Sequence, residues 1–151
     1  MKRTKRTNKS NNRTRRTRRS HNHNNSINYS HQKIVTMFLQ MLNTVKLYHW
    51  KTFSYAQHKA TDELYTNLNL NIDTFVEIML GKTGSRVNLT GQKTLPLLDY
   101  TNVQDFTKEV NKYKEFLMKM DLEATNNSDL LNVRDEILGN LNQFTYLLTF
   151  K

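Results

Sequence analysis

Apolar residues recur every three or four positions in two stretches of the first half of the chain. Because this spacing lines up one face of an α-helix, the pattern predicts a helix over residues 29–52 and a second over 54–80. Gly81 is the predicted stop of the second helix. The apolar face consists of Ile34, Phe38, Met41, Leu42, Val45 and Tyr48 in the first helix, and of Leu64, Leu68, Ile72, Phe75, Val76 and Met79 in the second.

The same spacing returns over residues 102–124 and 129–150. Thr101-x-x-Gln104 has the form of a capping box, and Ser128 is a suitable N-cap for the last helix. The apolar faces here are Val103, Phe106, Val110, Tyr113, Leu117 and Met120, followed by Leu130, Val133, Ile137, Leu141, Phe144 and Leu148.

A long connection over residues 82–101 separates the two pairs of helices and holds the only proline, Pro96. Because a structureless loop of about 20 residues is unusual inside a compact domain, we expect it to cross the full length of a bundle. Residues 94–100 are expected to form a short helix or to pack as an apolar strap. Gly139, inside the last helix, is expected to permit a close helix contact. The order of elements predicts an all-α, ferritin-like four-helix bundle over residues 29–151.

The composition narrows the class of protein. The 151 residues contain no cysteine, which excludes disulfides, iron–sulfur clusters and zinc fingers, and only one proline and four glycines, which favours helices. No apolar run approaches the length of about 18 residues that crosses a bilayer. The N-terminus has no apolar stretch of a secretory signal. We therefore expect an intracellular protein with no membrane partner.

The net charge of +10 comes from the N-terminus. Residues 2–19 hold all of the excess, so residues 1–28 are predicted to be a basic tail and linker that is disordered when free. Non-specific nucleic acid, DNA before RNA, is the first expected partner; nuclear import and simple solubilisation are alternatives. The predicted nucleic-acid-binding residues are Lys2, Arg3, Lys5, Arg6, Lys9, Arg13, Arg15, Arg16, Arg18 and Arg19.

Two pairs of candidate metal ligands lie in the second predicted helix. His58 and Asp62 form one pair, here the His–Asp clip, and Asp73 and Glu77 form the other, the Asp–Glu clip. Residues four apart share one face of a helix. His49 is a third candidate just upstream. Imidazole and carboxylate ligands favour iron, manganese or zinc. The alternative is that these are ordinary polar positions on a helix face, with His49 a satisfied core residue.

The two clips are too far apart to share an ion within one chain. They are separated by 15 positions, or about 22 Å along a helix axis. The helix therefore carries two separate half-sites, or it meets a second, antiparallel copy of itself. A two-fold axis would place the His–Asp clip of one chain opposite the Asp–Glu clip of the other.

This arrangement resembles the Dps family of mini-ferritins, which bind DNA and detoxify iron. The resemblance rests on His49-Trp50 at the end of one helix and on the two clips, with ten residues between them, on the next. It covers about residues 29–150. The chain departs from the family at two places: nine positions rather than twelve separate His49 from His58, and Ile78 follows Glu77 where the family usually has Arg.

The resemblance implies a ferroxidase centre across a two-fold interface, with iron bound by His49 and the His–Asp clip of one subunit and by the Asp–Glu clip of its neighbour. The family normally forms a shell of twelve subunits. The segment from Tyr48 to Tyr65 is also similar to an uncharacterised family from large DNA viruses, which implies a nucleus or a virion as the location. Three functions remain open: a DNA-associated ferroxidase, a non-enzymatic nucleoprotein bundle that packages a genome, and an assembly stabilised by manganese or zinc.

Overall fold

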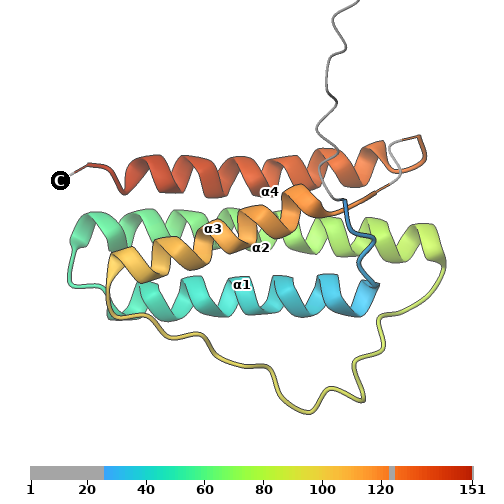
Figure 1. The fold of residues 1–151 in the computed structure, drawn as a ribbon, viewed down its shortest axis with the longest axis horizontal. Coiled ribbons are helices and arrows are strands. Elements are labelled where there is room, and N and C mark those ends of the chain that lie inside the picture. The colour runs from blue at the N-terminus through green and yellow to red at the C-terminus, as the bar shows by residue number, and fades with distance from the viewer. Residues whose placement is uncertain (1–25, 123–124, 151) are drawn as a thin grey trace, which may run out of the picture.

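The computed structural model describes residues 26–122 and 125–150, and these form four helices: α1 (His31–Lys51), α2 (Tyr55–Thr83), α3 (Val103–Lys119) and α4 (Ser128–Leu147) (Figure 1). Two antiparallel hairpins, α1–α2 and α3–α4, are joined by one long crossover. The helix α2 packs against both α1 and α4. The predicted all-α four-helix bundle with a long crossover is confirmed. The basic residues of the predicted tail lie outside the described residues.

Several predicted helix ends were wrong by a few residues. The helix α2 continues through Gly81 to Thr83, and Gly84 caps it in the left-handed conformation with φ 61°. A residue without a Cβ adopts this conformation at little cost. The N-cap of α3 is Asn102 rather than Thr101; its side chain accepts a hydrogen bond from the backbone N–H of Asp105. The N-cap of α4 is Asn127, and Ser128 is the first helical residue.

The segment before α1 packs on the end of α3. The N–H of Ile27 donates to the carbonyl of Lys119 at 2.6 Å, and the N–H of Asp121 donates to the carbonyl of Ile27 at 2.9 Å. This pairing requires extended backbone at Met120, so α3 ends at Lys119. Ser26, the first described residue, adds to this pairing, because its hydroxyl donates to Asp121 at 3.2 Å.

The crossover between α2 and α3 follows the outside of α1. Thr36, near the start of α1, donates to Gln92 at 3.3 Å, and Lys51, at its end, donates to Asp99 at 2.8 Å. None of the crossover is helical, and Leu95 and Leu98 are half-buried. Of the two predicted forms, the apolar strap is the one observed.

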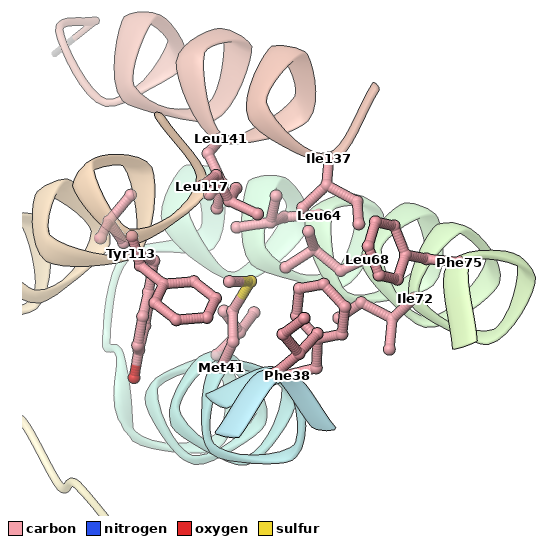
Figure 2. Close-up of a cluster of buried hydrophobic side chains, with 14 of the residues drawn as sticks. Phe38, Met41, Leu64, Leu68, Ile72, Phe75, Tyr113, Leu117, Ile137 and Leu141 are labelled. Atoms are coloured by element: carbon pink, nitrogen blue, oxygen red, sulfur yellow. The ribbon is translucent and has the colours of Figure 1, made fainter. Parts of the chain in front are cut away.

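The predicted apolar stripes meet in one core between the four helices (Figure 2). Phe38 and Phe75 meet edge to face at 5.2 Å, and Tyr48 stacks on Phe106 at 4.0 Å. Four residues predicted in the core are only half-buried at its margin: Leu42, Val76, Val103 and Leu148. Phe116, which the pattern did not single out, is buried. The close contact expected at Gly139 is wrong, because a Cβ there would meet no atom within 4 Å.

Candidate metal half-site

The turn between α1 and α2 determines how the two histidines meet. The hydroxyls of Tyr48 and Thr52 both donate to the side-chain oxygen of Gln57, each at 2.8 Å. These bonds tie the last turn of α1 to the first turn of α2. His49 and His58 therefore face each other across the hairpin, although only nine positions separate them.

His49 and His58 form a reciprocal pair. Their rings stack with centroids 4.0 Å apart and planes 23° apart. Nδ1 of His49 lies 3.1 Å from the carbonyl oxygen of His58, and Nδ1 of His58 lies 3.1 Å from the carbonyl oxygen of His49. A carbonyl oxygen only accepts, so each Nδ1 carries the hydrogen and donates it. In the neutral rings both Nε2 atoms then hold a lone pair. Metal-binding histidines are commonly oriented in this way.

Thr61 and Asp62 complete this cluster. Thr61 is fully buried, and its hydroxyl donates into α2, to the carbonyls of Gln57 at 2.8 Å and His58 at 3.0 Å. Its oxygen lies 3.3 Å from Nδ1 of His49. On the other side of that ring, Nε2 is 3.8 Å from Oδ1 of Asp62. His49 is 7% exposed, whereas the Asp62 side chain is 53% exposed, so Asp62 lies on the solvent-exposed side of the cluster.

Three of these residues were predicted from the sequence, and Thr61 was not. Threonine three positions after His58 carries no distinctive signal, because hydroxyls bonded to their own helix are common. Thr61 became identifiable only when the hairpin placed it beneath His49.

The Asp–Glu clip lies apart from this cluster. Asp73 and Glu77 are exposed on the same continuous helix, about 22 Å along its axis from the His–Asp clip. Within the ranges that the structure describes, no three His, Asp or Glu side chains are grouped so as to hold a metal ion. One chain therefore presents two incomplete candidate ligand sets: the cluster of His49, His58 and Asp62, and a separate pair of carboxylates.

An apolar groove runs beside Asp73 on the outer face of the α1–α2 hairpin. It has a volume of about 240 Å³ and is lined by Val35, Phe38, Leu39, Leu42, Asn69, Ile72, Asp73 and Val76. The half-buried Leu42 and Val76, which the pattern placed in the core, belong to this groove. An apolar groove with one carboxylate at its side is a surface that another apolar group can fill.

The other end of the same hairpin face is aromatic. The ammonium of Lys46 lies 4.6 Å from the ring centroid of Tyr65 and 5.7 Å from that of Trp50. Trp50 is 68% exposed, which is unusual for the largest apolar side chain. The hairpin face thus carries Trp50 and the His–Asp clip at one end, and the groove and Asp73 at the other.

Fold and geometry together define a four-helix bundle protein with a histidine–carboxylate cluster at its α1–α2 turn. The chain belongs to a family of unknown function, DUF5856, which matches residues 49–148, a span that includes His49 and both clips. No solved structure matches it. In the described ranges no helix combines the length and apolar character needed to cross a membrane.

Two curated proteins share a short segment with the chain. Exocyst complex component 6B of Homo sapiens is 37% identical over 60 residues, which is 36% of this chain and 7% of that protein. Its counterpart from Mus musculus is 42% identical over 45 residues, 30% of this chain and 6% of that protein. The chain thus spans only a small fraction of the length of either relative.

Proposed function

We propose that the chain is a Dps-like DNA-binding and iron-binding protein that oxidises Fe(II) at a site shared by two copies. The observation that carries this proposal is the reciprocal bonding of His49 and His58. It leaves a lone pair on Nε2 of each neutral ring, and Nε2 of His49 lies 3.8 Å from Oδ1 of Asp62. Imidazole nitrogen and carboxylate oxygen are the ligands that iron accepts, and manganese and zinc suit the same set.

A second copy supplies the further carboxylate ligands that the half-site of one chain lacks. Two antiparallel hairpins would bring the Asp–Glu clip of one copy opposite the His–Asp clip of the other. Fe(II) is then the substrate. Two Fe(II) ions each give one electron to hydrogen peroxide, the O–O bond breaks, and two protons complete two water molecules. The carboxylates of Asp62, Asp73 and Glu77 stabilise the increased charge of the ferric product.

The nucleic-acid part of the proposal rests on charge. The chain has a net charge of +10, and the excess is in residues 2–19. Such a segment binds phosphates without reading sequence, so its affinity for DNA falls steeply with added salt. This function suits a location where DNA is concentrated, such as a nucleus or the virion of a large DNA virus.

The test is anaerobic loading of the full chain with Fe(II), followed by peroxide and optical detection of ferric product. We expect saturable oxidation well above the buffer rate. It is lost in Asp73→Asn/Glu77→Gln and kept in the control Glu115→Gln/Glu136→Gln, which removes two exposed charges from other helices. Oxidation at the buffer rate by the folded chain would disprove the ferroxidase.

The second candidate is a non-enzymatic nucleoprotein bundle that packages a genome. It is favoured by the lack of a three-ligand group among the described residues. It predicts that deletion of residues 1–24 abolishes DNA compaction, while the intact chain shows no iron chemistry. Iron oxidation that survives removal of the tail favours the first candidate instead.

A further inference from the structure

We propose that Trp50 of one copy fills the apolar groove of a second copy, and that this exchange sets the register of the dimer. The inference deepens the proposed function, because it rests on the antiparallel pairing that completes the shared site. Its occupant is a second copy of this chain, identified by the fit of one exposed side chain to one groove.

Trp50 belongs to the same face of α1 as the groove. Val35, Leu39 and Leu42 line the groove, and Lys46 and Trp50 continue from them at intervals of four residues. Residues at this spacing form one stripe of a helix. An antiparallel partner that packs on this stripe therefore meets both the groove and the indole ring.

The register follows from contacts within the hairpin. Lys46 lies over Tyr65, and His49 faces Asp62, so each pair marks a common level of α1 and α2. A two-fold axis that places the clips opposite each other passes midway between them, level with Asn67 and Leu68 of α2. The same level of α1 is between Asn43 and Thr44.

This axis brings the partner's Trp50 level with the groove. Trp50 lies between six and seven residues beyond the axis, or about 10 Å at 1.5 Å per residue. The partner's Trp50 therefore arrives level with Met37, between Val35 and Leu39, where the groove is. The groove and the Asp–Glu clip share Asp73, so the pairing that completes the metal site also brings Trp50 level with the groove.

The chemistry of the groove suits an indole ring. Its apolar walls are aliphatic apart from Phe38, and its volume of about 240 Å³ accommodates a side chain of this size. The indole N–H is a donor only, and Asp73 and Asn69 line the groove as acceptors. Tryptophan is also the residue type that most often anchors protein interfaces from a pocket.

The chain contains a single tryptophan, so its fluorescence reports this contact directly. In the full chain we expect dimers by sedimentation, with blue-shifted emission that iodide quenches poorly. Leu39→Glu, on the rim of the groove, should move the emission to longer wavelength, expose it to iodide and raise the dimer dissociation constant about tenfold or more. The matched control Leu70→Glu changes an exposed leucine outside the groove and should alter none of these.

Trp50→Ala keeps the inference testable if Leu39→Glu misfolds, because Trp50 is exposed and contributes little to the core. It should weaken the dimer by a similar factor, with unchanged helicity. Emission that stays solvent-exposed in the wild-type dimer, or a dimer that tolerates Trp50→Ala, would overturn the inference. A dimer with buried Trp50 but no iron oxidation supports the inference and removes the ferroxidase. Iron oxidation by a chain whose Trp50 stays exposed supports the ferroxidase and overturns the inference.

Discussion

Buried hydroxyls of Thr44 and Tyr113 join α1 to α3 through one hydrogen bond of 2.8 Å. Thr44 already donates to the carbonyl of Gln40, so the phenol is the donor. Thr44→Val leaves that phenol buried without a partner and should cost about 1–3 kcal/mol of unfolding free energy. Adding Tyr113→Phe removes the orphaned group and should restore part of the loss. Urea denaturation of the four proteins measures the coupling; strictly additive losses would contradict it.

Tyr100 makes the stability of the crossover depend on pH. Burial first, and its hydrogen bond to Glu109 second, raise the pKa of Tyr100 from 10.0 to about 12. The unfolded chain releases this proton at lower pH than the folded chain. The contribution is therefore complete below pH 10 and is lost as the pH rises towards 12. Tyr100→Phe should flatten the fall of the urea midpoint over this range, whereas Tyr55→Phe, at an exposed position, should leave it unchanged.

Two helix glycines should respond in opposite directions to the same substitution. Gly84 caps α2 with φ 61°, where a Cβ is strained, so Gly84→Ala should destabilise the bundle by about 1 kcal/mol. Gly139 lies inside α4 with open space around its Cα, so Gly139→Ala should stabilise it by about 0.5–1 kcal/mol. Thermal denaturation of both variants checks the signs. A loss at Gly139 would reveal a close contact there after all.

At the scale of the helices, the sequence was sufficient to predict that each helix forms but not the residues at which it ends. Periodicity identifies helices because each must bury one stripe. The end of α3 depends on Ile27, more than 90 positions away, which no local pattern shows. The candidate site divides in the same way. Spacing within α2 predicted that both clips share a face. The pairing of His49 with His58, in contrast, depends on the turn, where two hydroxyls of α1 and the turn donate hydrogen bonds to the side chain of Gln57.

The whole molecule has one face whose features are incomplete without a second copy. The α1–α2 hairpin carries an apolar groove, an exposed tryptophan and candidate metal ligands divided into two separated sets. The opposite sides of α1 and α2 are closed by α3, α4 and the core. These features share one two-fold register, so the proposed dimer accounts for all three with a single geometric operation.

The two-fold pairing predicts that two inactive variants recover activity when they are combined in one dimer. His58→Ala/Asp62→Ala removes one half of every shared site, and Asp73→Asn/Glu77→Gln removes the other half, so each variant alone should fail to oxidise Fe(II). Unfolded and refolded together in equal amounts, half of the dimers are mixed, and each mixed dimer contains one intact site and one that lacks both halves. About a quarter of the wild-type rate should therefore return. Mixing without refolding is the control. No recovery, with mixed dimers demonstrated by differently sized tags, would show that each chain binds iron alone or not at all, because only a site built across the interface can be restored by combining two inactive chains.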